Sequence, residues 1–220
     1  MEQRSYSEIV RNLMGDYRYE HSVNVAAEAV ELARLYGENE EKAYTAGILH
    51  DITKEFPKEE QLRIITDFGI ILDDVQQKAP KLWHSISGSV YIQTALDVTD
   101  GDIVNAVRYH TTGRANMSLL EKIIYIADYT AQGRTYNGVE IMREKSRSSL
   151  EDAMIFSFQF TFQKLSSEEI AIHPDELFAY NDIVLNKSLQ IKSQAPKENL
   201  TKNFCRQIAG RKITFFRHDK

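Results

Sequence analysis

The spacing of the apolar residues constrains the fold more than any other feature of this chain. These residues recur at intervals of three and four along nearly all of the sequence, which is the period of an α-helix rather than of a β-strand. Between residues 17 and 36, for example, Val23, Ala26, Ala27 and Val30 share one broad face, and Gly37 follows as a stop signal. We therefore predict an all-α fold.

The predicted helices are bounded by Gly, Pro, Asp or Ser residues. Only ten glycines and four prolines occur among the 220 residues, and a chain of this length can bury an ample core. We find no convincing pair of strands and no internal repeat. The predicted helices cover approximately residues 17–36, 40–50, 58–68, 84–96, 102–109, 118–129, 150–165 and 174–185.

The composition argues against several other classes of protein. With 42% apolar and 27% charged residues, the chain is unlike collagen, a disulfide-rich scaffold or a wholly disordered segment. Its single cysteine cannot form an internal disulfide, no apolar run approaches the ~18 residues of a membrane span, and its polar start does not look like a secretion signal. We therefore expect a protein of the reducing cytoplasm, without a membrane partner. The net charge of −5 gives no reason to expect a nucleic-acid partner.

The charge is distributed unevenly along the chain. Residues 186–220 hold nine basic and two acidic side chains, so their net charge is +7 and that of residues 1–185 is −12. This break predicts a domain over residues 1–186 and a basic, loosely structured extension over residues 187–220. The alternatives for the extension are docking on the acidic domain, pairing of subunits, or contact with a polyanion.

Four of the six histidines stand where a helix would otherwise bury apolar side chains or end: His21, His50, His84 and His110. Any one of them alone would be interpreted as a core or surface histidine, but the four together fit that interpretation poorly. Asp128 adds to the pattern because it lies in the apolar segment 123–129. A carboxylate buried there needs a cation, hydrogen-bond donors or a metal ion, unless the side chain faces solvent.

The doublet His50-Asp51 closes a predicted helix, where the last turn can aim two adjacent side chains at one point. Imidazole nitrogen and carboxylate oxygen suit iron, manganese or zinc, and the absence of cysteine ligands argues against a structural zinc site. A set of His21, His50, Asp51 and Asp128 would supply ligands from three helices. Such a set leaves coordination positions open, as in catalytic metal sites.

The order of His21, the doublet His50-Asp51 and Asp128 resembles the pattern of the HD superfamily of metal-dependent phosphohydrolases. More closely, the chain resembles the YqeK family, the HD-domain symmetrical bis(5′-nucleosyl)-tetraphosphatases of bacteria. The similarity covers roughly residues 5–186 and ends where the charge balance shifts. Its most specific segments are 106–114 and 117–129, and it also includes 21–23, 42–43, 46–54, 84, 87–89, 172–174 and 179–181.

The resemblance implies an all-helical HD-domain bundle that hydrolyses diadenosine tetraphosphate (and related dinucleoside polyphosphates) to two ADP as a homodimer. It implies an iron-type centre, with Mn²⁺ or Co²⁺ as alternatives, held by His21, His50, Asp51 and Asp128. The residues that match nucleotide-contacting positions are Arg18, Asp51, Ile52, Thr53, Lys54, His84, His110, Thr111, Asp128, Arg134, Ala171, Ile172, His173, Pro174, Asp175 and Glu176.

One segment departs from the family pattern. After the metal-binding Asp, the family usually carries Pro before Gly-Arg and then Phe-Pro-Gly, whereas this chain has Gln132 before Gly133-Arg134 and Asn137 before Gly138. Because Gly133 and Arg134 remain, we keep Arg134 as a phosphate ligand. The shape of the loop, and with it the fine substrate preference, is not predicted.

For the mechanism we hypothesise that Asp51, His84, His110 and Asp128 are catalytic, and that a metal-bound hydroxide attacks an inner phosphorus. His84 and His110 would either donate hydrogen bonds and a proton to the leaving group or hold a second metal bridged by Asp51. Both alternatives stay open. So do two other functions: hydrolysis of another nucleotide, such as a dNTP, a nucleoside monophosphate or a guanosine alarmone, and non-catalytic sensing of nucleotide or metal.

The supporting residues also have simpler interpretations. Lys54 could be a cation at a helix end, and Arg134 could pair with Glu140. His173 would ordinarily be a loop residue before a helix start. Arg114 and Lys122 are interpreted as surface or ion-pair residues. The aromatic set is expected to form core or dimer surface rather than to stack on bases; it comprises Phe156, Phe158, Phe160 and Phe162.

Overall fold

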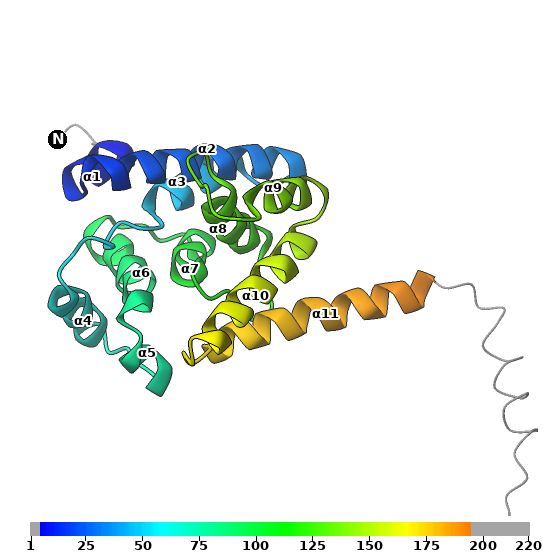
Figure 1. Ribbon diagram of the computed structural model, residues 1–220. Helices are drawn as coiled ribbons and strands as arrows, with labels where there is room; N and C mark the ends of the chain where they lie inside the picture. Colours follow the sequence, from blue (N-terminus) through cyan, green and yellow to red (C-terminus); the bar gives the residue numbers. More distant parts are fainter. Residues whose placement is uncertain (1–4, 195–220) are drawn as a thin grey trace, which may run out of the picture. The chain divides into compact units, whose positions relative to one another are not determined.

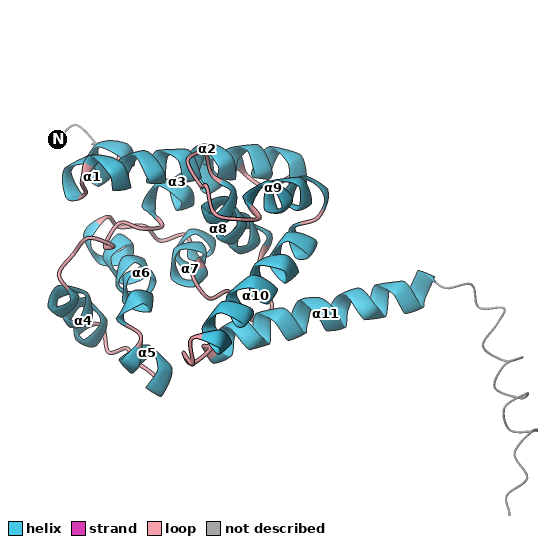
Figure 2. Ribbon diagram, in the orientation of Figure 1, coloured by secondary structure: helices cyan, strands magenta, loops and turns pink. Residues whose placement is uncertain are grey.

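The computed structural model describes residues 5–194, with side chains described up to residue 189. The chain separates into two units, Met1–Val184 and Leu185–Lys220. All regular structure among the described residues is helical (Figure 2), which confirms the predicted all-α class. The helices are α1 (Tyr6–Leu13), α2 (Asp16–Tyr36), α3 (Glu40–Leu49), α4 (Lys58–Asp67), α5 (Asp74–Lys78), α6 (Trp83–Ala95), α7 (Gly101–Tyr109), α8 (Leu119–Thr130), α9 (Val139–Ser148), α10 (Leu150–Ser167) and α11 (Pro174–Gln194), with a 3-10 turn η1 (Pro80–Leu82) before α6.

Every predicted helix is present, with ends within two residues of those predicted, except that α11 continues to Gln194. The apolar spacing does not predict α1, α5 and α9. These helices bury few apolar side chains: α1 buries Val10, α5 buries only the polar Gln76, and α9 buries Val139 and Met142. Capping boxes start the first two instead, at Ser5 for α1 and at Asp73 for α5.

The core of the first unit lies among α2, α3, α7 and α8, which pack against one another. In Figure 1, α2 runs along the top of this unit and the other three lie beneath it. The backbones of α2 and α3 approach closely because both helices place small residues at the contact. A Cβ atom on Gly47 would lie 2.7 Å from the Cα atom of Ala26, closer than packed atoms allow. This close approach sets His50, three residues after Gly47, opposite His21 on α2.

Other helices extend this core. Phe158 on α10 is fully buried against Tyr125 on α8, and Ala179 and Ile183 anchor the first turns of α11 in the same cluster. A smaller apolar cluster, built from Ile65, Leu72 and Ile86, joins α4 to α6. None of the described helices combines the length and apolarity that crossing a lipid bilayer requires.

The boundary predicted after residue 186 lies close to the division between the two units, within α11. The predicted loose structure of the basic extension concerns mainly residues 195–220, which lie outside the described residues. The boundary and the character of the extension therefore stay predictions.

Candidate active site

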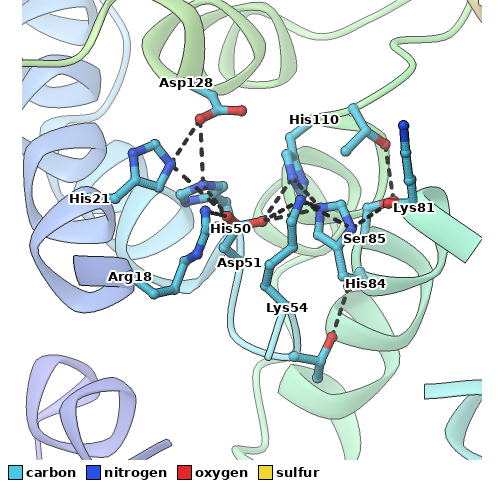
Figure 3. Close-up of polar contacts among 12 residues, drawn as sticks. Arg18, His21, His50, Asp51, Lys54, Lys81, His84, Ser85, His110 and Asp128 are labelled. Carbon is cyan, nitrogen blue, oxygen red and sulfur yellow. Dashed lines mark hydrogen bonds and ion pairs between the residues drawn. The ribbon is translucent and has the colours of Figure 1, made fainter. Parts of the chain in front are cut away.

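Five helices direct polar side chains to one point inside the first unit (Figure 3). His21 lies in the second turn of α2, and Asp128 lies in the last turn of α8. His50 and His110 are the C-terminal caps of α3 and α7, and His84 lies in the first turn of α6. The loosened last turn of α3 carries Asp51 directly after His50, so this doublet does point into one site, as its position at a helix end predicts.

Asp51 is the centre of the site, and its two carboxylate oxygens face different groups. Oδ2 lies 2.8 Å from Arg18 Nη1, 3.5 Å from His50 Nε2 and 4.0 Å from His21 Nε2. Oδ1 lies 3.1 Å from His84 Nε2 and 3.5 Å from His110 Nε2. The side chain is 3% exposed, so these neighbours replace nearly all of its solvent.

Asp128 faces the same site from α8. Its Oδ1 lies 3.0 Å from His21 Nε2 and 3.8 Å from His50 Nε2, and the side chain also forms an ion pair with Arg134. Arg134 Nε donates a hydrogen bond of 2.6 Å to the backbone carbonyl of Asp128. Asp128 therefore does not project into solvent. Arg134 pairs with it rather than with Glu140.

Backbone carbonyls fix the orientation of three of the imidazole rings. The Nδ1 atoms of His50, His84 and His110 lie 2.7, 2.8 and 2.8 Å from the carbonyl oxygens three residues earlier in the chain. A ring that donates from Nδ1 keeps an acceptor lone pair on Nε2. All three Nε2 atoms point toward the carboxylate of Asp51, as the ligand atoms of a metal-binding histidine would.

The donor set fits a divalent metal ion. His50 Nε2 and Asp51 Oδ1 are buried without a hydrogen-bond partner among the described residues. The Nε2 atoms of His84 and His110 lie only 3.1 Å apart, and two lone pairs at this distance require a proton or a cation between them. The possible ligand groups, whose atoms lie within 4.8 Å of one another, are His21, His50 and Asp51; His50, His110 and Asp128; and Asp51, His84 and His110.

The electrostatics of the site keep both aspartates ionised. Burial opposes ionisation of Asp51, but the charge of His50 and the close imidazoles of His110 and His84 hold its pKa well below the usual range. Burial likewise opposes ionisation of Asp128, and His21, His50 and Arg134 hold its pKa well below the usual range. Burial lowers the pKa of His84 to about 4. The site therefore presents anionic oxygens beside a neutral imidazole.

The other residues predicted beside Asp51 occupy different positions. Lys54 Nζ lies 3.6 Å from Asp51 Oδ1 and 2.9 Å from His84 Nε2, so its ammonium group lies within the site. The side chain of Ile52 packs in the apolar core. Thr53 is buried, and its hydroxyl donates to the carbonyl of His84 at 2.9 Å. The hydroxyl of Thr111 lies 3.1 Å from that of Ser85.

The predicted segment 171–176 lines a separate cavity of about 300 Å³. Lys81 and Leu82, just before His84, and Tyr129, just after Asp128, belong to the same lining, so the cavity adjoins the backbone that carries the site. His173 Nε2 lies 3.0 Å from Asp73 Oδ2. Burial raises the pKa of Glu176 to about 7. The lining residues from the predicted segment are Ala171, His173 and Glu176; Ile172, Pro174 and Asp175 complete the segment itself.

Several simpler interpretations are confirmed. Arg114 pairs with Glu121, and Lys122 pairs with Glu151, each at 2.7 Å. Phe158 is buried, and Phe156 and Phe162 pack against the core, whereas Phe160 is partly exposed and lines the cavity.

Sequence reasoning missed the role of Arg143 on α9. Arg143 donates hydrogen bonds of 3.0 to 3.2 Å to the carbonyls of Thr130, Ala131 and Arg134. It therefore fixes the loop that carries Arg134. No sequence signal marks it, because its partners are backbone atoms.

The comparisons with known proteins agree with this geometry. The model of the HD domain family matches residues 18–133, which include His21, the doublet His50-Asp51 and Asp128. A protein of Halalkalibacterium halodurans named "Bis(5'-nucleosyl)-tetraphosphatase, symmetrical" is 36% identical over 82% of this chain and 96% of its own length. A Bacillus subtilis protein of the same name is 38% identical over 80% of this chain and 94% of its own length.

A solved structure also resembles the chain. The crystal structure described as a predicted HD superfamily hydrolase involved in NAD metabolism, from Clostridium acetobutylicum, superimposes with a TM-score of 0.80. The two sequences are 37% identical, and the match covers 82% of this chain and 96% of the other. The sequence, the fold and the arrangement of the site therefore all indicate the same family.

Proposed function

Because this chain belongs to the HD-domain family of symmetrical bis(5′-nucleosyl)-tetraphosphatases, we propose that it hydrolyses diadenosine tetraphosphate, and related dinucleoside tetraphosphates, to two nucleoside diphosphates. The observation that carries this proposal is Asp51, whose two oxygens face separate groups of histidines beside three cationic side chains. Hydrolysis of a phosphoanhydride needs an activated water and groups that offset charge on phosphoryl oxygens.

The chain's ligand atoms fit a catalytic metal centre. In this proposal His21, His50, Asp51 and Asp128 would hold one divalent ion, and Asp51, His84 and His110 would hold a second. The close approach of the two Nε2 atoms favours this arrangement over two free histidines. A bound divalent ion supplies an activated water and offsets charge on the phosphoryl oxygens. We propose iron as the physiological metal, because imidazole and carboxylate ligands without cysteine suit it; Mn²⁺ and Co²⁺ share these preferences.

The cationic residues bind and orient the phosphates. Arg18 and Arg134 lie on the Oδ2 side of Asp51 and along Asp128, and each presents further N–H donors that suit phosphate oxygens. Lys54 lies on the Oδ1 side, where its ammonium can offset the charge of the leaving nucleoside diphosphate. These roles require no covalent step on the protein, because hydrolysis transfers the phosphoryl group to water.

The cavity lined by Ala171, His173 and Glu176 is the proposed binding site for one nucleoside. Its walls combine apolar and aromatic side chains with a few polar groups, which is typical of small-molecule sites. It adjoins Lys81, whose carbonyl accepts the hydrogen bond from His84 Nδ1. A nucleoside in the cavity would place its phosphates toward Lys54 and the histidine pair. We further propose that the protein works in the cytoplasm as a homodimer.

Anaerobic purification followed by metal analysis and product analysis tests this function. Diadenosine tetraphosphate should yield two ADP per molecule, with an iron content of at least one ion per chain. ATP plus AMP as products, or no turnover after restoring iron, manganese or cobalt, would contradict the proposal. Parallel reactions with a dNTP and with a guanosine alarmone separate it from hydrolysis of another nucleotide.

A further inference from the structure

The proposed substrate has two nucleosides, whereas the cavity beside segment 171–176 accounts for one. Cleavage between the two middle phosphates leaves one nucleoside diphosphate on each side of the metal ligands. The cavity adjoins the side of Asp51 that faces His84. The second nucleoside diphosphate must therefore extend along the other side, where Arg18 and Arg134 lie.

Tyr17 stands at the outer end of that side. It lies in the first turn of α2, four residues before His21, and residues four apart share one face of a helix. The side chain of Tyr17 is 77% exposed, so its ring is available to a ligand. Exposed aromatic residues are common on protein surfaces, and only the position of this one singles it out.

One of the two proposed phosphate-binding arginines, Arg18, lies close to Tyr17. The guanidinium carbon of Arg18 is 5.9 Å from the centre of the Tyr17 ring, while Arg18 Nη1 contacts Asp51 Oδ2 at 2.8 Å. Arg134 Nη2 lies 3.4 Å from His21 Nε2, and His21 is four residues after Tyr17 on the same helix. The order from the site outward is therefore Asp51, then a guanidinium group, then an aromatic ring. The same order runs through half of the substrate: the scissile phosphate, a second phosphate, and the nucleoside.

We propose that Tyr17 forms a second nucleoside subsite, where its ring stacks on the base while Arg18 and Arg134 bind the phosphates of that half. This proposal rests on the proposed function and adds to it the position of the second nucleoside. Stacking on one aromatic ring tolerates different bases, because every base has a π-face. The subsite therefore takes a nucleoside diphosphate group with little choice of base.

The test compares Tyr17→Ala and Tyr17→Trp with the unchanged protein, with metal loaded, on two ligands. The first is diadenosine tetraphosphate as substrate, and the second is inorganic tetraphosphate as a competitive inhibitor without a base. Tyr44→Ala is the matched control, since Tyr44 is a partly exposed tyrosine on α3. Tyr17→Ala should raise the KM for diadenosine tetraphosphate about tenfold and leave kcat within about twofold. The inhibition constant of inorganic tetraphosphate should not change, and Tyr17→Trp should retain a KM near that of the unchanged protein.

Two outcomes would overturn the subsite. An unchanged KM in Tyr17→Ala would show that the base does not contact this ring. An equal rise in the inhibition constant of inorganic tetraphosphate would show that Tyr17 only positions Arg18. If the unchanged protein forms no ADP from diadenosine tetraphosphate, it is the proposed function that fails. Calorimetric binding of diadenosine tetraphosphate to the same proteins then still tests the subsite by the same tenfold criterion.

Discussion

The two sides of Asp51 use different means to stabilise charge. The arginine side is formed by Arg18, His21, His50, Asp128 and Arg134. Here the carboxylates of Asp51 and Asp128 form ion pairs with the permanently charged guanidinium groups of Arg18 and Arg134. On the histidine-pair side, formed by Lys54, His84 and His110, two imidazole nitrogens face each other at 3.1 Å beside the second oxygen of Asp51.

This difference has a physical consequence for metal binding. The arginine side already has positive charge opposite its carboxylates, so it can stay ordered without an ion. The histidine-pair side brings together two lone pairs that repel each other, and the ammonium of Lys54, 2.9 Å from His84 Nε2, offsets only that of His84. We therefore expect the ion on the histidine-pair side to contribute more to local order, and the arginines to contribute more to phosphate binding.

Replacing Asp51 removes the carboxylate whose two oxygens face both sides. Asp51→Ala should lose all bound metal and lower kcat by more than about a thousandfold, because both ligand groups lose a carboxylate and charge stabilisation at the phosphoryl oxygens fails. Metal per chain by elemental analysis and ADP formation measure the two effects. Asp67→Asn, an exposed aspartate in the last turn of α4, is the control. Wild-type metal content in Asp51→Ala would refute the shared-ligand assignment.

Single histidine replacements separate the two sides. His110→Ala should lose about one ion per chain and keep the ion on the arginine side, whereas His21→Ala should do the reverse. Each should lower kcat by about a hundredfold, since even the loss of an outer partner of a metal ligand costs about 10- to 100-fold. Loss of both ions from either variant, or of neither from both, would contradict a two-ion site bridged by Asp51. Elemental analysis of the two variants side by side decides this.

Arg134 tests whether the arginine side binds phosphate. Arg134→Ala should raise the KM for diadenosine tetraphosphate about ten- to a hundredfold, because a hydrogen bond to a charged group contributes about 1.5–3 kcal/mol. Arg134→Lys keeps the charge but loses the paired donors, so its KM should lie between those of the unchanged protein and Arg134→Ala. Arg147→Ala, which removes a partly exposed pair with Glu28, should change KM little. A normal KM in Arg134→Ala would leave Arg134 only the task of pairing with Asp128.

The two sides also differ in how far the sequence could predict them. The order of His21, His50-Asp51 and Asp128 singled out the proposed metal ligands of the arginine side, and apolar spacing placed the helices that carry them. Which oxygen of Asp51 faces which histidine depends on the last turn of α3, where the helical period no longer determines direction. The contact between His84 and His110 also depends on the packing of α6 against α7, which spacing along one helix cannot specify.

The contacts between side chains and backbone carbonyls were not predicted. Arg143 binds three carbonyls around the Arg134 loop, and Thr53 binds the carbonyl of His84. Both contacts depend on the tertiary path of the chain rather than on residue type. The same holds for α1 and α5, whose capping boxes are short local signals that the search for apolar faces passes over.

Glu176 extends the comparison to the cavity beyond the histidine-pair side and gives the smallest expected effect. Asp51 and Asp128 stay ionised among cations, whereas burial raises the pKa of Glu176 to about 7, and its Oε2 has no hydrogen-bond partner among the described residues. Because the pKa of Glu176 is higher in the folded protein than in the unfolded chain, folding takes up a proton. The protonated form therefore stabilises the folded state, and this stabilisation is lost as pH rises through about 7. From pH 6 to pH 8 the contribution of Glu176 to the free energy of unfolding should fall by about 1 kcal/mol.

Glu176→Gln removes this titration without removing the bulk of the side chain. The difference in the free energy of unfolding between Glu176→Gln and the unchanged protein, measured by urea denaturation, should therefore shift by about 1 kcal/mol in favour of the variant from pH 6 to pH 8. Taking the difference cancels the titration of the metal ligands, which both proteins share. Glu144→Gln, at an exposed position on α9, should show no such shift. If the difference in the free energy of unfolding does not change with pH, a cation or hydrogen-bond donor must stabilise the ionised carboxylate of Glu176 in solution. The cavity would then resemble the arginine side, where carboxylates stay ionised.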